Sequence, residues 1–240
     1  MSDAPNNTDA LAVIIGRAGS KGLPGKNALP VAGRPMICHT IKHARAARRV
    51  GRIIVSTDGA EIAQAAREMD VPVIDRPPVL AGDLATVDAA VRHAVETDGG
   101  TESIIVILYA NVPVRPLDLI DRAVETLVET GADSVQSYCD VGKHHPYWMV
   151  NLDEDGRVKA HHPNTAYRRQ DLPELYLPDG GVIAVTRRNL FTVVEGQPHG
   201  FLGADRRGIV SPPGSVVDID ESIDLLVAET MILERTEGEA

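Results

Sequence analysis

Leu11-Ala-Val-Ile-Ile15 runs directly into a glycine-rich stretch, Gly16–Asn27 (GRAGSKGLPGKN). Two further runs of the same kind, Arg52–Ser56 (RIIVS) and Ser103–Leu108 (SIIVIL), follow along the chain. Short, β-branched and almost continuously apolar runs are typical of strands that a parallel sheet buries on both faces. We therefore expect these runs to form the centre of such a sheet, with the glycine-rich stretch at its carboxyl edge, where ligands of open α/β folds bind.

Amphipathic stretches separate the apolar runs. Their spacing predicts one helix that Pro35 opens and further helices over Ala60–Met69, Thr86–Thr97 and Asp118–Glu129. Strands that alternate with helices imply right-handed crossovers, so we expect an α/β fold with a mostly parallel sheet and helices on both faces. The 240 residues are within reach of a single large domain, and we expect one domain over 1–240.

The pattern changes after Ser137. Residues 138–178 carry many Pro, His, Tyr and Arg residues, with a predicted turn at Asp153–Gly156 between two short strand-like pieces. This segment is too small for a core of its own, so we expect it to pack on the main domain or on a partner subunit. Two strands and a closing helix are predicted after it, at Gly181–Val185, Ser215–Ile219 and about Glu221 to Glu234.

Composition limits the class of protein. Hydrophobic residues make up 43% and charged residues 24%, as in ordinary globular proteins, and the net charge of −10 gives no basic footprint for nucleic acid. Cys38 and Cys139 are too few for a disulfide framework or a Cys-rich metal site. The first ten residues lack a signal-peptide pattern, and no apolar run approaches the ~18–20 residues of a membrane span. We expect a cytoplasmic protein with no nucleic-acid or membrane partner.

The glycine-rich stretch has the composition of an anion site. Its four glycines allow backbone N–H groups to turn inward, and Arg17, Lys21 and Lys26 add three cations to an otherwise acidic protein. This suits a triphosphate, although the spacing is neither that of a Walker loop nor that of the dinucleotide turn. The alternative is a flexible, solvated basic loop.

Val217-Asp-Ile-Asp220 closes the last predicted strand. In an extended segment Asp218 and Asp220 point to the same side, and two carboxylates plus substrate phosphates are what Mg²⁺ usually accepts. The alternative is that Asp220 caps the helix that follows.

Other polar residues leave two interpretations open. The adjacent histidines in Lys143–Pro146 have no further ligand at metal spacing, which favours surface residues over a zinc site. Arg168-Arg169 either reaches an anionic substrate or is a solvated pair. Asp58 either touches a ligand or caps the helix predicted from Ala60. Cys139 has no base partner nearby in the sequence and is interpreted as structural.

Taken together, these motifs resemble the acylneuraminate cytidylyltransferases, the CMP-sialic acid synthetase family. The first and last motifs, Arg17–Asn27 and Val217–Asp220, are the specific ones, and the resemblance spans nearly the whole chain in the family's order. Between them it is carried by Val55–Asp58, Arg76-Pro77, Leu80-Ala81 with Asp83, Val112-Pro113 with Arg115, His144–Pro146, Arg169–Pro173 and Pro178–Gly180. The sister family that makes CMP-Kdo carries a different loop, so the chain is placed on the acylneuraminate side.

The resemblance implies a three-layer, Rossmann-like fold of the nucleotide-diphospho-sugar transferase type and a homodimer joined through residues 138–178. It also implies a reaction: the anomeric 2-hydroxyl of a 2-keto-3-deoxy sugar acid attacks the α-phosphate of CTP and releases pyrophosphate. The residues that would bind the nucleotide are Arg17, Ala18, Gly19, Ser20, Lys21, Lys26 and Asn27. Those with catalytic roles would be Arg17, Lys21, Lys26 and Asp220. Mg²⁺ would be held by Asp218 and Asp220, and the sugar acid by Tyr109, Arg115, His145 and Arg169.

Several positions depart from the family pattern around the sugar. Tyr109 stands where Gln is common, Leu177 where Arg is common, Asp179 where Asn is common, and Ile183 where Tyr is common. We therefore expect N-acetylneuraminate to be a poor substrate. Two alternatives remain: a cytidylyltransferase for another sugar acid, including a Kdo-like one, or a non-catalytic nucleotide-binding module on the same fold. The paired aspartates and the lysines favour catalysis.

Overall fold

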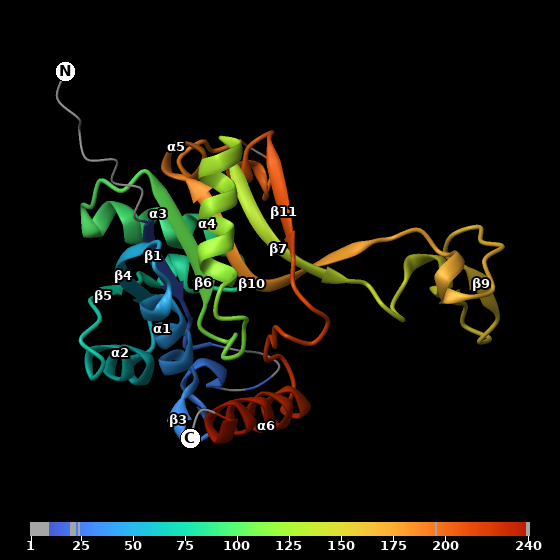
Figure 1. The fold of residues 1–240 in the computed structure, drawn as a ribbon, viewed down its shortest axis with the longest axis horizontal. Coiled ribbons are helices and arrows are strands. Elements are labelled where there is room, and N and C mark those ends of the chain that lie inside the picture. Colours follow the sequence, from blue (N-terminus) through green and yellow to red (C-terminus); the bar gives the residue numbers. More distant parts are fainter. Residues whose placement is uncertain (1–9, 20–22, 24, 195, 239–240) are drawn as a thin grey trace.

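The computed structural model describes residues 10–19, 23, 25–194 and 196–238. Its central strands are β1 (Ala10–Ile15), β4 (Val50–Thr57), β5 (Val73–Asp75), β6 (Ile104–Tyr109), β7 (Ser134–Asp140), β10 (Tyr176–Thr186) and β11 (Arg206–Val210). They form one sheet in the order β11-β7-β10-β6-β1-β4-β5 (Figure 1). Only β10 runs antiparallel to its neighbours, β6 and β7. The predicted mostly parallel sheet is confirmed.

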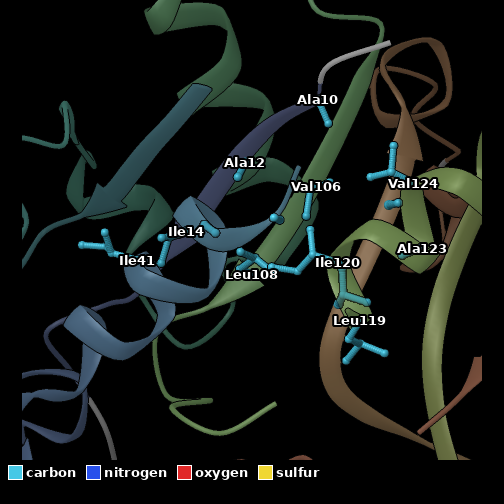
Figure 2. Packing of buried hydrophobic residues seen from close by; sticks show 14 of the residues in the cluster. Ala10, Ala12, Ile14, Ile41, Val106, Leu108, Leu119, Ile120, Ala123 and Val124 are labelled. Carbon is cyan, nitrogen blue, oxygen red and sulfur yellow. The ribbon is translucent and has the colours of Figure 1, made fainter. Parts of the chain in front are cut away.

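Helices cover both faces of this sheet: α1 (Met36–Ala46), α2 (Ala60–Arg67), α3 (Val87–Asp98), α4 (Leu119–Thr130) and α5 (Arg187–Leu190). Helix α6 (Ser222–Gly238) packs instead on a separate apolar cluster that includes Met36 and Val217. Buried residues of α1, α2 and α4 pack against one face (Figure 2), whereas those of α3, α5 and the 3-10 turn η5 (Gly200–Leu202) pack against the other. The three-layer arrangement is therefore confirmed. Pro35 precedes α1 rather than opening it, and α2 ends two residues before the predicted Met69.

Strand β1 lies at the centre of both apolar layers. Ala10, Ala12 and Ile14 belong to one cluster, and the alternate residues Leu11, Val13 and Ile15 belong to the other. No residue of the strand is more than 7% exposed. Successive side chains of a strand point to opposite faces, so a run with apolar residues at every position is buried on both sides.

One predicted strand, Ser215–Ile219, is wrong. This segment makes a single isolated bridge, between Val217 and Val114. The edge position beside β7 is taken by β11 instead. Strand β11 begins with Arg206-Arg207 and contains Gly208, so it lacks the apolar run by which a buried strand is recognised.

Residues 138–178, which we call the arm, project away from the sheet (Figure 1). Strands β7 and β10 continue past the sheet as a two-stranded ribbon, with Tyr176 opposite Asp140. The outer part holds a short hairpin of β8 (Val150–Leu152) and β9 (Val158–Ala160). Between 142 and 178 only His145 is buried. The arm therefore has almost no apolar interior, and its role in a dimer stays a prediction.

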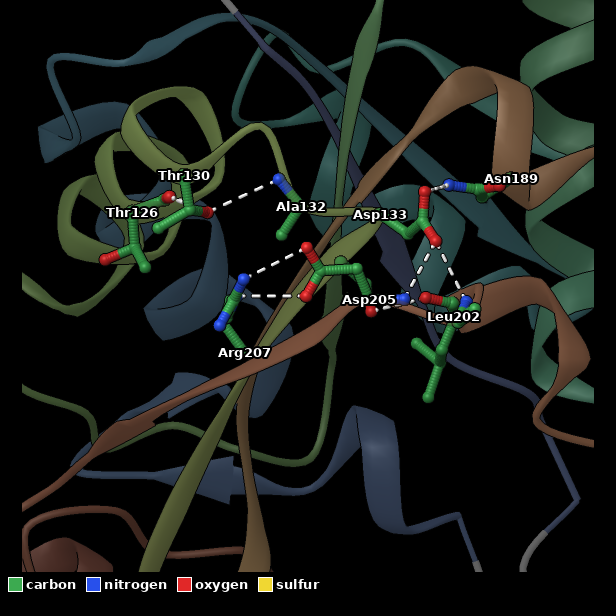
Figure 3. A network of polar contacts seen from close by, with 10 residues as sticks. Thr126, Thr130, Ala132, Asp133, Asn189, Leu202, Asp205 and Arg207 are labelled. Carbon is green, nitrogen blue, oxygen red and sulfur yellow. Dashed lines mark hydrogen bonds and ion pairs between the residues drawn. The ribbon is translucent and has the colours of Figure 1, made fainter.

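A polar network lies at the end of the sheet where β7 and β11 begin (Figure 3). It joins the residues just before these two strands to helix α5. The Asp133 carboxylate accepts hydrogen bonds from the backbone N–H groups of Ala204 (2.8 Å) and Asp205 (3.0 Å) and from Nδ2 of Asn189 (2.6 Å). These donors favour the ionised form, and they hold the pKa of Asp133 below its usual value.

Asp133→Asn is expected to destabilise the protein at neutral pH, because an amide cannot accept all three hydrogen bonds. A loss of about 1.5 kcal/mol lowers Tm by about 3–6 °C. A group whose pKa is lowered by folding stabilises the fold above its unfolded pKa and loses this effect as the pH falls through its folded value, so the difference should shrink below about pH 4. Calorimetry at pH 7 and pH 3 measures it. Asp205→Asn, which removes only an exposed ion pair with Arg207, is the control.

Candidate nucleotide-binding and catalytic site

The glycine-rich loop leaves the carboxyl end of β1 close against the next strand. The backbone N–H of Gly16 donates to Ser56 O at 3.2 Å. A Cβ atom at Gly16 would lie only 2.8 Å from Cβ of Ala110, which side chains do not tolerate. Glycine is therefore required where the chain enters the loop.

Two hydrogen bonds fix the first part of this loop. Oδ1 of Asp58, which follows β4, accepts from the backbone N–H of Ala18 at 2.8 Å, and Nδ2 of Asn27 donates to Arg17 O at 2.9 Å. Asp58 is thus an anchor for the loop, a role that sequence reasoning missed. Ser20 and Lys21, expected to bind the triphosphate, lie outside the described residues.

A pocket of about 270 Å³ opens between the loop and the segment that leads into α3. Arg17 stands at its edge, where its guanidinium donates to Asp83 Oδ1 at 2.7 Å. Asn27 is 6% exposed, and its Oδ1 has no hydrogen-bond partner within the described part of the chain. Because buried acceptors are rarely left unpaired, this oxygen is suited to receive an N–H from a bound molecule.

The two motifs at opposite ends of the sequence meet beside this pocket. Nζ of Lys26, in the 3-10 turn η1 (Lys26–Ala28), lies 2.8 Å from Oδ1 of Asp220. The Lys26 side chain is 13% exposed and that of Asp220 is 73% exposed. The glycine-rich loop and the paired aspartates therefore form one site.

Asp218 lies close to Asp220 and is held by a polar neighbour. Asn111 Nδ2, after β6, donates a hydrogen bond to Asp218 Oδ1. Gly180, with a φ of +74°, leaves room on the other side, because its Cβ would lie 3.3 Å from Asp218 Oδ2. Displacement of water by the surrounding protein, and then the charge of Asp220, raise the pKa of Asp218 to about 6. Asn111 is a further site residue that sequence reasoning missed, since a lone Asn after a strand carries no distinct signal.

These carboxylates fit a divalent cation. The charge of Asp220 contributes to the raised pKa of Asp218, so a positive charge beside both carboxylates would stabilise the ionised form of Asp218, and the ammonium of Lys26 already stands beside Asp220. No group of three or more His, Cys, Asp or Glu residues suited to a metal occurs within the described ranges. Mg²⁺ needs only one or two protein carboxylates when phosphates and water supply its other ligands.

Arg115, predicted to contact the sugar acid, is fully buried instead. Its guanidinium donates to Gly181 O (2.9 Å), Thr40 Oγ1 (3.2 Å) and Tyr109 O (3.3 Å). Burial lowers the pKa of Arg115 to about 9, whereas Asp179 and Asp218 oppose this shift. Arg115 therefore supports the backbone around the site, and its contact with the sugar acid stays a prediction.

Tyr109 connects the first pocket to a second one of about 360 Å³. Thr86 and Val87 line both pockets as well. The walls of the second pocket are mostly apolar or aromatic and include Tyr138, Pro178, Ile183, Pro198, Phe201 and Leu202. Burial raises the pKa of Tyr109, so its hydroxyl stays protonated and can donate a hydrogen bond at neutral pH.

His145 and Arg169 lie on the arm and line neither of these two pockets. Nδ1 of His145 accepts from the backbone N–H of Tyr147 at 3.1 Å, so Nε2 carries the proton and donates to Pro173 O at 3.1 Å. Arg169 is exposed and donates to Asp140 Oδ1 at 3.2 Å. The structure does not bring these two residues to the pockets of the same chain.

Known proteins are similar to this chain in sequence and in fold. A family model described as cytidylyltransferase matches residues 11–193. The chain belongs to the cytidylyltransferase family. Its fold is similar to that of a CMP:2-keto-3-deoxy-manno-octonic acid synthetase complexed with CTP, with a TM-score of 0.72 at 17% identity over 95% of this chain and 99% of that one.

Curated relatives are similar in sequence as well. An N-acylneuraminate cytidylyltransferase of Streptococcus agalactiae is 33% identical over 72% of this chain and 42% of its own length. A CMP-N,N'-diacetyllegionaminic acid synthase of Legionella pneumophila is 36% identical over 62% of this chain and 65% of its own. The chain thus spans less than two thirds of either relative. The resemblance stated from the motifs is confirmed.

Among the residues that the structure describes, no helix is both long and apolar enough to cross a membrane.

Asp218→Asn is expected to raise the stability of the ligand-free protein at pH 8 and to leave it unchanged near pH 3. Because the folded-state pKa is raised above the model value of 3.8, Asp218 has no effect on stability at a pH below both values, and it opposes folding increasingly as the pH rises to about 6, above which the cost is complete. Solvent screens the exposed side of the carboxylate, so we expect a gain of about 1 kcal/mol or less, or about 2–4 °C in Tm. Thermal unfolding without divalent cations measures it. A lower Tm at pH 8 would contradict the assigned charge.

Proposed function

We propose that this chain is a Mg²⁺-dependent cytidylyltransferase that activates a 2-keto-3-deoxy sugar acid of the nonulosonic type with CTP. The observation that carries the proposal is the meeting of Lys26 and Asp220, which are 194 positions apart in the sequence and 2.8 Å apart in space. It joins a cationic, glycine-rich loop to a pair of carboxylates at the carboxyl edge of a sheet. We also propose a cytoplasmic location, since CTP is made there.

The reaction replaces a phosphoanhydride bond of CTP with a phosphate ester bond to the sugar acid. The 2-hydroxyl oxygen of the sugar acid bonds to the α-phosphorus of CTP, the bond from that phosphorus to the bridging oxygen breaks, and pyrophosphate leaves. The hydroxyl proton passes to solvent. Such transfers depend mainly on positioning and charge neutralisation.

The chain's own residues divide these tasks. Arg17 and Lys26 place positive charge at the pocket, and the free Oδ1 of Asn27 can accept an N–H from the nucleotide. Asp218 and Asp220 would hold Mg²⁺, which supplies further charge neutralisation at the phosphates when bound. In the structure Arg17 and Lys26 are each paired with a carboxylate, Asp83 and Asp220, so binding of a triphosphate requires an exchange of partners.

Asp220→Asn is expected to lower the turnover number at least ~100-fold, because the change removes a negative charge while nearly keeping the shape. Pyrophosphate release at a series of Mg²⁺ concentrations measures the effect. Glu221→Gln, next in the chain, is the matched control. Near-normal turnover of Asp220→Asn at limiting Mg²⁺ would exclude this carboxylate as a ligand.

The second pocket is the proposed place of the sugar acid, because it adjoins the first through Tyr109. Ile183 and Pro178 give one wall without polar groups, where the family commonly has Tyr in place of Ile183. The one arginine among its lining residues, Arg206, already donates to Gly203 O and His199 O. The sugar carboxylate therefore needs a cation from elsewhere.

N-acetylneuraminate is expected to be a poor substrate compared with other eight- or nine-carbon 3-deoxy-2-keto acids. A missing charge-assisted hydrogen bond costs about 1.5–3 kcal/mol, or roughly 10- to 150-fold in binding. Steady-state kinetics of pyrophosphate release with CTP and a panel of such acids, Kdo included, measures kcat/KM. The highest value for N-acetylneuraminate would contradict the argument from Leu177 and Ile183, and no release with any acid would favour the non-catalytic module.

A homodimer would supply the missing cation. Arg169 is exposed and lines neither of the two pockets of its own chain, so we propose that it serves the site of the other copy. Its present partner, Asp140, is also partly exposed, and exposed ion pairs exchange at little cost.

Complementation between two inactive variants tests this arrangement. Arg169→Ala and Asp220→Asn copies, mixed and allowed to exchange, should regain about a quarter of the wild-type rate, because half of the random dimers carry one intact site. If Arg169 acts within its own chain, the mixture stays inactive. Light scattering at the assay concentration reports the oligomeric state.

A further inference from the structure

A larger cavity, of about 760 Å³, opens at the edge of the sheet opposite the candidate site. Strands β6 and β7 begin at this edge, and β10 ends there. The lining comes from the residues just before β6 and β7, from the last turns of α4, and from Thr186 and α5. None of these residues lines either pocket of the candidate site, so the cavity is separate from it.

Part of this lining is cationic. Arg187 and Arg188 both line the cavity, and neither guanidinium has an ion pair or a hydrogen-bond acceptor in the described part of the chain. Nη1 of Arg187 is buried and unpaired. Because buried donors of a charged group are rarely left without an acceptor, this guanidinium is suited to an anion that another molecule provides.

The guanidinium of Arg187 can leave its present position at little cost. It lies over the ring of Phe191, with Cζ 5.4 Å from the ring centre. A cation–π contact of this kind stabilises less than a charge-assisted hydrogen bond does. An anion in the cavity would therefore draw the guanidinium away from Phe191, and the ring would then present a flat apolar surface.

Asp133 is the acidic residue of the lining, and its charge is already engaged. Its carboxylate accepts the three hydrogen bonds described above (Figure 3). These hydrogen bonds, chiefly the one from Asp205, and to a smaller extent the charge of Arg188 lower the pKa of Asp133. With two arginines against one such carboxylate, the lining has a net positive charge in a protein whose net charge is −10. This balance favours an anionic ligand.

The lining also has an apolar part, made of Ile104, Leu127, Val128 and Phe191. A ligand that fits both parts carries an anionic group and an apolar or aromatic group. Phosphate monoesters carry close to two negative charges at neutral pH, which two arginines can match, and the planar guanidinium binds phosphate oxygens in pairs. Inorganic phosphate has no group for the apolar part.

We propose that this cavity binds a phosphate monoester that carries an aromatic or apolar group. Arg187 turns from Phe191 to the phosphate, Arg188 adds the second positive charge, and the organic group packs against the freed ring and the apolar side chains beside it. The inference is independent of the proposed function, because no residue of this cavity takes part in the proposed reaction.

Phenyl phosphate is the probe, and calorimetric titration of the full chain measures its affinity. Arg187→Gln should weaken binding at least about 10-fold, because it removes a charge-assisted hydrogen bond. Arg188→Gln changes an exposed residue, so folding is not at stake, and it should weaken binding about two- to fivefold. Arg207→Gln is the matched control: this exposed arginine of β11 pairs with Asp205 and lies outside the lining, so affinity should stay within about twofold. Tm verifies that each variant folds.

The place of binding is tested by the chemical shifts of backbone amides during titration of the ¹⁵N-labelled chain, because the candidate site is also proposed to bind phosphates. Shifts at residues 101–104, 131–133 and 187–191 are expected, and inorganic phosphate should bind at least about 10-fold more weakly than phenyl phosphate. Shifts confined to residues 16–27 would overturn the inference. Equal affinity for inorganic phosphate, unchanged affinity of Arg187→Gln, or no binding of phenyl phosphate would overturn it as well, and each of these results leaves the proposed function standing.

Discussion

The burial of β1 on both faces is the constraint on which the site depends. Its alternate residues belong to two separate apolar layers, so the strand can neither slip by one residue nor rotate without exposing one of them. The strand ends at Ile15, and the close approach of Gly16 to Ala110 then sets the direction in which the loop leaves. The pocket is therefore placed by the hydrophobic core, and its polar groups only complete it.

Around the pocket, opposite charges hold one another in place. The protein is acidic overall, yet Arg17 and Lys26 face the pocket because Asp83 and Asp220 stand beside them. Arg115 lies below, fully buried, with its guanidinium committed to backbone and hydroxyl oxygens. Breaking such buried hydrogen bonds costs more than breaking exposed ion pairs, so the support beneath the site is firm while the charges at its surface are exchangeable.

The centre of the fold could be predicted from the sequence because its strands are apolar at every position. The far edge could not, because β11 opens with Arg206-Arg207 and contains Gly208. Asp218 and Asp220 lie close together, as the spacing predicts. The segment that carries them is not a strand, however, because it makes only a single bridge, between Val217 and Val114. The burial of Arg115 could not be predicted from the sequence, because arginine side chains are mostly exposed in folded proteins. Asn111 as a partner of Asp218, and the role of Asp58 as an anchor of the loop, were missed because the bonded residues are distant in the chain.

The two outer strands of the sheet are poor templates for further pairing. Strand β5 has only three residues and ends at Asp75, and β11 begins with two exposed arginines. Short and charged edges of this kind protect a sheet from edge-to-edge aggregation. Backbone hydrogen bonding is thus disfavoured as a way of joining one copy to another, and association is left to side-chain surfaces, whose specificity depends on shape and charge rather than on a repeating ladder.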